Sequence, residues 1–368
     1  MNILINIFVG IFAAYAFQKR SKPCGLGYWR GVAGAVGGVI PHLDILFYGI
    51  GGGFGLLHQY AETWSLIIAP ILAWGAACGL SWVNKGYLPE SPKTWQKFFV
   101  PILAAVLVSI FLGVMSENGV ALIAPFWQAK LGFGILYSFD IGLLFGLLGF
   151  MVLAVVLPKA RIELSQLALV LLVGYIGLAT TFKFKAEAIA DRYAQVMELE
   201  VEHIYALPQP LSPFYWRIIV KTTDERLHDT MVSLKRKNAI VVTPQTSPVR
   251  RAKAPYKPVH EAIWRIYNRF GFDEDNREFA KAAWRSDISK RLGWVSRFAV
   301  LKDFVTYDNK RCARFKDLRF EGIQHGNLGE YLLCQQSAAE QAEHKRNDGW
   351  LAYQAADDGA FLRLDPIY

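Results

Sequence analysis

Four ionisable side chains lie close together in an otherwise apolar, glycine-rich stretch near the start of the chain: His42, Asp44, His58 and Glu62. Imidazole and carboxylate groups are ligands that zinc and other first-row divalent ions prefer. Ionisable groups are costly in apolar surroundings, so their presence there indicates a functional site. The sequence therefore predicts that His42, Asp44 and His58 bind a divalent metal ion, zinc or manganese.

A catalytic metal site needs about three protein ligands and an open position for water. Glu62 and Glu117 are the candidates for a catalytic carboxylate that completes the metal shell, and Asp140 is a further acidic residue in the apolar half of the chain. One alternative stays open. Asp44 and His58 could instead bind each other or satisfy backbone groups of a buried loop, with no metal present.

The positions of the charged residues divide the chain into two halves. Of the 40 Lys and Arg and the 31 Asp and Glu, only ten and six respectively precede residue 183, although 53% of the whole chain is hydrophobic. Apolar runs that lack charge predict membrane segments. We therefore expect a polytopic α-helical membrane domain over residues 1–182 and a soluble α+β domain over residues 183–368.

The apolar half contains about five to six candidate membrane segments, with residues 41–64 forming a re-entrant or cavity-lining loop between them. Proline and clustered glycines break regular helix in that loop. The expected segments are Asn2–Phe17, Gly31–Tyr48, Ser65–Val83, Phe98–Met115, Gly132–Leu157 and Leu164–Phe182.

The C-terminal half shows a mixture of strand and helix patterns. Trp216–Thr222 reads as a strand, and Phe298–Arg319 as a hairpin that turns near Asp308. His260–Phe270 and Asp275–Arg291 have the spacing of amphipathic helices.

The charge balance suits a lipid bilayer better than a nucleic acid. The net charge is +9, but no nucleic-acid-binding motif accompanies it. The basic loops alternate along the first half, and six crossings would place the C-terminal half outside the cytoplasm. If the second segment is only re-entrant, that half could be cytoplasmic. Cys312 and Cys334 could form a disulfide in an oxidising compartment, or remain free thiols.

Three short segments of the first half carry a family resemblance: IPHLD, HQYAETWS and GVALIAPFW. Their matching residues are Asp44, His58, Thr63, Ser65, Gly119, Pro125 and Phe126. With them the chain resembles the bacterial inner-membrane family of YdjM-like proteins, known as LexA-binding, metal-dependent membrane hydrolases. The later segments ALPQPLSPFYWRIIV and RFKDLRF resemble the C-terminal extension of a longer subgroup.

The resemblance implies a metal-dependent hydrolase in the bacterial inner membrane, but the ligand positions depart from the family pattern. Trp64 stands where the family has its second histidine, and Ser109 and Gly113 replace a further histidine and aspartate. Losing these ligands removes most of the free energy of metal binding. The alternative is therefore a non-enzymatic membrane anchor whose residues 183–368 bind a protein or lipid partner.

Overall fold

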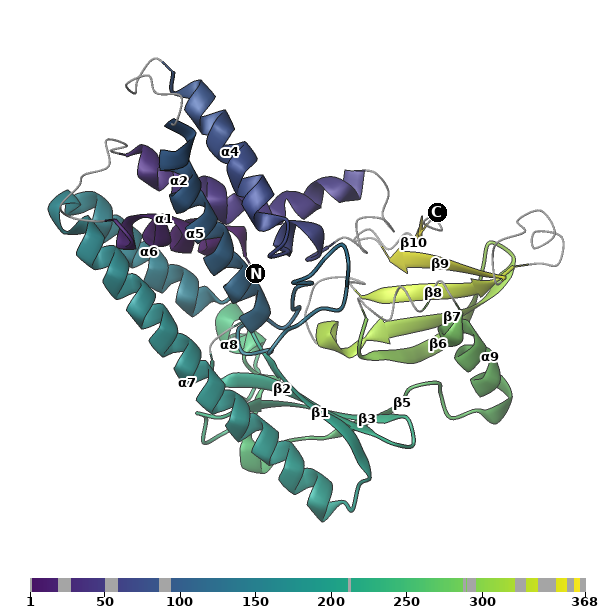
Figure 1. The fold of residues 1–368 in the computed structure, drawn as a ribbon. Helices are drawn as coiled ribbons and strands as arrows, with labels where there is room; N and C mark the ends of the chain where they lie inside the picture. Colours follow the sequence, from purple (N-terminus) through teal and green to yellow (C-terminus); the bar gives the residue numbers. More distant parts are fainter. Residues whose placement is uncertain are drawn as a thin grey trace.

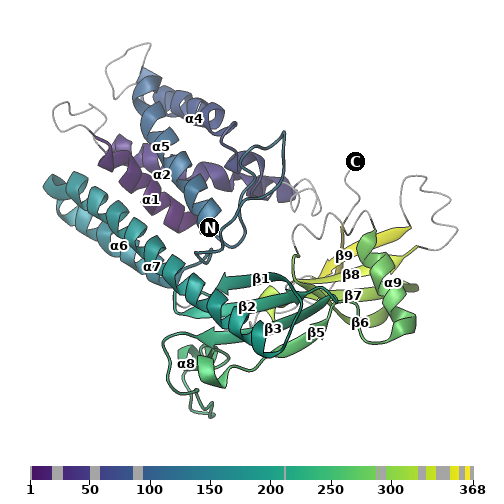
Figure 2. The same ribbon diagram turned by 60° about the horizontal axis from the view of Figure 1, so that its bottom comes forward.

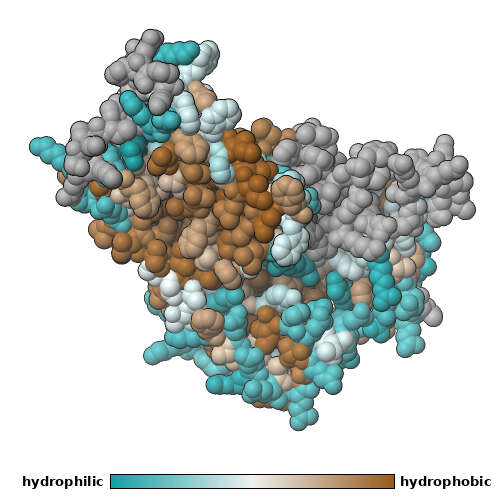
Figure 3. Space-filling model, in the orientation of Figure 1, coloured by the Kyte–Doolittle hydropathy of each residue, from teal (hydrophilic) through white to brown (hydrophobic). Residues whose placement is uncertain are grey.

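The computed structural model describes residues 2–18, 28–49, 59–85, 94–210, 213–286, 289, 296–321, 329–336, 349–355 and 361–364. A helical N-terminal part is followed by a β-rich C-terminal part, and helix α7 joins them (Figures 1 and 2). Hydrophobic surface gathers over the helical part and hydrophilic surface over the β-rich part (Figure 3).

The helical part contains six α-helices and several short 3₁₀ segments among its described residues. They are α1 (Ile3–Ala16), α2 (Trp29–Val39), η1 (Ile40–Gly49), η2 (Glu62–Trp64), α4 (Ala69–Val83), α5 (Thr94–Met115), α6 (Ile141–Val156), η3 (Pro158–Ala160) and α7 (Arg161–Val196). Helices α1, α2 and α5 pack together, and α6 lies along α7 (Figures 1 and 2).

Glycine allows α2 to approach its neighbours closely. A Cβ atom on Gly34 would lie 2.5 Å from the carbonyl oxygen of Gly10 in α1, and one on Gly37 would lie 2.5 Å from that of Ile102 in α5. Small residues let helix backbones meet in this way inside apolar bundles. The glycine-rich stretch that begins the predicted site is therefore a tightly packed helix up to Val39.

The expectation of about five to six membrane segments is wrong. Over the described part of the chain, only Thr94–Met115 and Pro158–Val196 are long and apolar enough to cross a membrane. Helices α1, α4 and α6 have 14, 15 and 16 residues, whereas a crossing needs about 20. The apolar runs of the sequence continue beyond the helix ends into turns and 3₁₀ segments. Helix lengths inferred from these runs were therefore too long.

The C-terminal part is largely β, which corrects the predicted α+β fold. One sheet has the order β1-β2-β3-β4, with β5 also on β3, and the other has the order β10-β9-β8-β7-β6. The strands of the first sheet are β1 (Val201–Pro208), β2 (Tyr215–Thr222), β3 (Arg226–Ser233), β4 (Lys257–Pro258) and β5 (Arg265–Asn268). Those of the second are β6 (Ala299–Tyr307), β7 (Lys310–Asp317), β8 (Glu330–Gln335), β9 (Trp350–Ala355) and β10 (Phe361–Leu364).

Short helical segments accompany the sheets: α8 (Pro248–Ala252), η4 (Val259–Glu261), α9 (Glu274–Arg285) and η5 (Leu318–Phe320). The predicted strand is confirmed as β2, and the predicted hairpin as β6–β7. Asp308 and Asn309 turn the hairpin with φ angles of 51° and 56°, as a tight hairpin turn requires. The helix predicted over His260–Phe270 is wrong, because most of that segment forms η4 and β5.

Helix α7 connects the two parts without a break and passes through the predicted boundary at residue 182. Its C-terminal half lays Ala186 and Ala190 on the first sheet, against Trp216 and Ile218 of β2. A second apolar cluster that includes Ile219 joins this sheet to the β6–β7 hairpin. Burial of this apolar surface holds the sheets against the end of the helical part.

We predict that Cys312 and Cys334 form a disulfide in the purified protein. They are paired directly across β7 and β8 and joined by a disulfide in the structure. The two cysteines are 22 residues apart in the sequence. Removing a disulfide that closes a loop of this length lowers the free energy of unfolding by about 3 kcal/mol. Mass spectrometry after alkylation should find both thiols protected until reductant is added, and Cys312→Ser should lower the unfolding temperature. Alkylation of both thiols without reductant would contradict this prediction, and Cys78→Ser serves as the control.

Candidate functional site: a tryptophan cluster and a polar cavity

Asp44 lies in η1 and is almost fully buried, with 6% of its surface exposed. Its Oδ2 atom accepts the backbone N–H of Tyr60 at 3.0 Å and the indole N–H of Trp64 at 3.3 Å. These two bonds tie η1 to the segment around η2. Oδ2 of Asp44 therefore already accepts two donors.

His42 is occupied in a similar way. Its Nε2 atom accepts a hydrogen bond from the side-chain amide of Asn6 in α1 at 2.8 Å. Its ring meets the ring of Trp64 edge-on, with 5.2 Å between the centroids. His42, Asp44 and Trp64 therefore come together as expected, but through hydrogen bonds and ring contacts.

Trp64 is completely buried and fills the space beside Gly113 of α5. A Cβ atom on Gly113 would lie 2.8 Å from both Cε3 and Cζ3 of the indole. Ser109, one turn earlier on α5, is also buried, and its hydroxyl has no hydrogen-bond partner among the residues described. We call His42, Asp44, Trp64 and Gly113 the Trp64 cluster.

The described residues of this cluster do not fit a divalent metal ion, because its indole occupies the space and its candidate ligands are engaged. In the part of the chain that the structure describes, no group of three or more His, Cys, Asp or Glu could hold a metal. His58 lies outside the described residues, so the predicted set of His42, Asp44 and His58 stays a prediction. Glu62 begins η2, whereas Glu117 follows α5 and faces a separate cavity.

That cavity, of about 300 Å³, lies where the α5–α6 loop meets the β-rich part. Charged and phenolic side chains from both parts line it: Tyr60, Glu117, Lys130, Tyr137, Arg297 and Arg319. Apart from Glu117, these residues were not predicted to belong to a site. Little in the sequence indicates that these residues form a site. Arg319 belongs to the segment RFKDLRF, which resembles a family segment, but no motif surrounds Lys130 or Arg297.

Cations outnumber carboxylates by three to one on the described lining of the cavity. Arg319 is paired with Asp317, with Nη2 2.8 Å from Oδ2, whereas Arg297 is exposed and has no hydrogen bond or ion pair among the described residues. Burial and the charge of Arg297 lower the pKa of Lys130 to about 8. Arg297 and Arg319 therefore repel the Lys130 ammonium group, whereas Asp44 and Glu62 attract it.

Glu117 is the acidic side chain that lines the cavity. Its Oε1 atom accepts the backbone N–H of Ser138 at 3.1 Å, whereas its buried Oε2 atom accepts no hydrogen bond from any described residue. Burial raises the pKa of Glu117. Burial and the charge of Glu117 together raise the pKa of Tyr137 to about 12. Both shifts are toward the neutral, proton-bearing form of the side chain.

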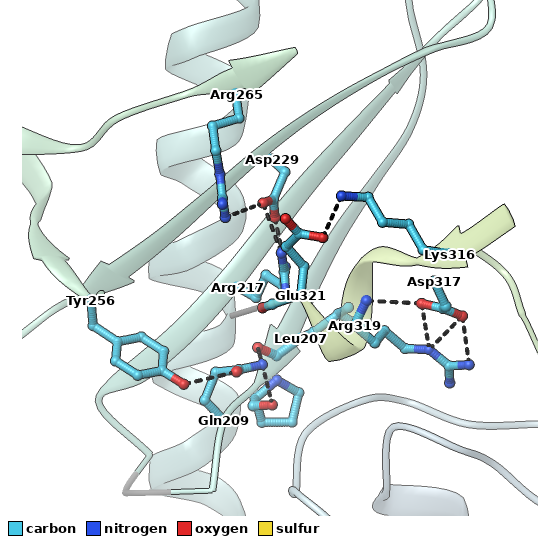
Figure 4. A network of polar contacts seen from close by, with 11 residues as sticks. Leu207, Gln209, Arg217, Asp229, Tyr256, Arg265, Lys316, Asp317, Arg319 and Glu321 are labelled. Atoms are coloured by element: carbon cyan, nitrogen blue, oxygen red, sulfur yellow. Dashed lines mark hydrogen bonds and ion pairs between the residues drawn. The ribbon is translucent and has the colours of Figure 1, made fainter. Parts of the chain in front are cut away.

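A buried polar network holds Arg319 at the edge of the cavity (Figure 4). Arg217 of β2 makes two hydrogen bonds with Asp229 of β3, of 2.7 and 2.9 Å, and a third with the carbonyl oxygen of Glu321 at 2.8 Å. Arg265 adds another bond to Asp229. Because Glu321 directly follows η5, this network fixes the segment that carries Arg319.

We predict that Gly113→Ala destabilises the protein. The new methyl group would collide with Trp64, and overpacking of this kind costs about 1–3 kcal/mol, more than the about 1 kcal/mol that alanine gains over glycine in a helix. Thermal unfolding of the full chain in detergent measures the effect. Gly79→Ala is the matched control, because a Cβ there meets nothing within 4 Å, and it should leave the unfolding temperature unchanged or raise it.

We also predict that Asp229→Ala destabilises the β-rich part strongly. It would leave Arg217 buried without its carboxylate, a change that typically costs 3–5 kcal/mol. Denaturant unfolding followed by near-UV circular dichroism should show the loss. Asp224→Ala removes a half-exposed partner of Arg226 and should cost under about 1 kcal/mol. Equal effects of the two substitutions would contradict this role of the buried pair.

Comparison with known proteins identifies the family. The YdjM inner membrane protein family matches residues 1–186, which is half of the chain. Searches of curated proteins and of solved structures find no match. The match covers the helical part, the Trp64 cluster and the loop that supplies Glu117 and Lys130 to the cavity. The chain therefore belongs to the YdjM inner membrane protein family.

Proposed function

We propose that this inner-membrane protein is a non-enzymatic anchor. Its helical part holds the β-rich part at the membrane surface, where residues 183–368 bind a protein partner. Exposed apolar side chains in and after strand β5 support a role in binding, since Ile266 is 49% and Phe272 79% exposed. Among the described strands β5 pairs with β3 alone, and an edge strand can pair with another chain.

The filling of the Trp64 cluster is the observation that carries this proposal. Metal-dependent hydrolysis needs free ligand atoms and an open coordination position for water. Here the indole N–H of Trp64 bonds to Asp44, and its ring covers Gly113. The two substitutions suit each other, because the large ring takes the space that a side chain at position 113 would need.

In this proposal helix α5 and the apolar N-terminal portion of α7 lie in the membrane, consistent with their length and hydropathy. The disulfide between Cys312 and Cys334 favours the arrangement in which the β-rich part lies outside the reducing cytoplasm.

A metal-dependent hydrolase is the second candidate function. The observation in its favour is that His42 and Asp44 both contact Trp64, so two predicted ligands share one location. His58 would have to supply a third ligand, with Glu62 or Glu117 as the catalytic carboxylate. Zinc or manganese would then supply an activated water for hydrolysis.

Metal analysis of the purified full chain separates the two candidates. We expect far less than one zinc or manganese per chain, and the same content in wild type, His58→Ala and Asp44→Asn. Asparagine keeps one oxygen that can accept the bonds from Tyr60 and Trp64, so this variant should fold. Stoichiometric metal in the wild type that is lost in both variants would reject the anchor proposal and support the hydrolase.

A further inference from the structure

We propose that the polar cavity between the α5–α6 loop and η5 binds a phosphate-bearing anion, either the headgroup of an anionic phospholipid or free phosphate. No residue of the Trp64 cluster lines this cavity. The inference therefore goes beyond the proposed function and does not depend on whether the chain is an enzyme.

The charges around the cavity call for an anion. Lys130, Arg297 and Arg319 are three cations on the described lining, and Glu117 is the carboxylate beside them. Behind the lining, Asp317 pairs with Arg319, and Asp44 and Glu62 attract Lys130. Arg297 has no ion pair among the described residues, so its charge lines the cavity without a counter-ion. A bound phosphate would relieve the mutual repulsion of the cations and form charge-assisted hydrogen bonds with them.

Several hydrogen-bonding groups on the cavity wall remain available to a ligand. Arg297 and the hydroxyl of Tyr137 have no hydrogen-bond partner among the described residues. The buried Oε2 atom of Glu117 also has no partner among these residues, and a ligand that binds such an atom removes the cost of leaving it unpaired. In its protonated form Glu117 can donate a hydrogen bond from Oε2 to a phosphate oxygen, as an uncharged carboxyl group does.

The dimensions of the cavity restrict the ligand to a small group. A volume of about 300 Å³ is at the lower end of the range for small-molecule sites. It can hold a phosphate with a short substituent, but not the acyl chains of a lipid. Those chains would have to remain outside, against apolar protein surface.

The α5–α6 loop offers that apolar surface. Phe126 is 81% and Trp127 65% exposed, and the nearby Ile123, Leu131 and Phe133 are also largely exposed. Exposed aromatic residues of inner-membrane proteins concentrate at the depth of the lipid headgroups. The same loop supplies Glu117, Lys130 and Tyr137 to the cavity, so a headgroup could enter while its chains stay beside Phe126 and Trp127.

Ligand-dependent thermal stability of the full chain in dodecyl maltoside tests the proposal. The probes are phosphatidylglycerol in mixed micelles and inorganic phosphate. Diacylglycerol with the same acyl chains and sodium chloride of equal ionic strength are their respective controls. We expect phosphatidylglycerol to raise the unfolding temperature in a saturable manner, and diacylglycerol to have little effect.

Variants then locate the binding. Arg297→Gln should raise the half-saturating concentration at least about tenfold, the loss expected when one charge-assisted hydrogen bond is removed. Arg250→Gln is the matched control, because Arg250 is likewise exposed without a hydrogen bond or ion pair among the described residues, and it should bind as the wild type does. Lys130→Met provides a second test at another cation of the lining, in the α5–α6 loop.

The responses to the two probes, phosphatidylglycerol and inorganic phosphate, identify the source of the anion. Stabilisation by phosphatidylglycerol alone supports a lipid headgroup, and stabilisation by inorganic phosphate above its salt control supports free phosphate. No stabilisation by either probe overturns the proposal. Equal half-saturating concentrations for Arg297→Gln and Arg250→Gln also overturn it, because the binding would then lie elsewhere.

Discussion

The buried ion pair between Arg217 and Asp229 is the interaction on which the arrangement of the two parts depends. Neither side chain is exposed, and burying charge is tolerated only when every donor and acceptor is satisfied. Asp229 meets this requirement with two arginines, and Arg217 with Asp229 and the carbonyl oxygen of Glu321. The pair therefore links β2, β3 and β5 of the first sheet to η5, which follows the β6–β7 hairpin and carries Arg319 to the helical part.

A second constraint operates within the helical part. There the size of the side chain at position 64 and the hydrogen bond that it donates both depend on its neighbours. A tryptophan at position 64 needs an empty volume beside α5, and Gly113 provides it. The same tryptophan supplies an N–H to a carboxylate that would otherwise be buried with fewer donors. Trp64 and Gly113 together therefore make the surroundings of the candidate ligands His42 and Asp44 a packed, hydrogen-bonded core.

The sequence predicted those features that depend on local pattern. The long apolar helix α5, strand β2 and the hairpin at Asp308 follow from composition, periodicity and turn chemistry. The family was inferred from the resemblance of short segments such as HQYAETWS to a known family. The number of membrane segments was overestimated, because apolar composition does not report where a helix ends. Val39 ends α2 before Pro41, and the residues between Ser65 and Ile68 form a turn before α4. His260–Phe270 became largely η4 and a strand because pairing of β5 with β3 outweighed its local helical spacing.

The candidate site was only partly predictable for a different reason. His42 and Asp44 are neighbours in sequence, so their proximity could be inferred, but the indole that fills their surroundings could not. The cavity joins residues that are far apart in the chain, such as Lys130 and Arg297. Nothing in the local sequence of either residue indicates that the two approach the same space.

In the proposed membrane arrangement, the unbroken α7 also sets how far the β-rich part stands from the bilayer. Its apolar portion, from Arg161 to Phe182, is about 33 Å long at 1.5 Å per residue, which matches a hydrocarbon core of about 30 Å. The charged remainder, from Lys183 to Val196, extends about 21 Å beyond it. Helix α7 therefore works as a rigid spacer, and a change in bilayer thickness that tilts it would lower or raise the attached sheet without any change inside the sheet itself.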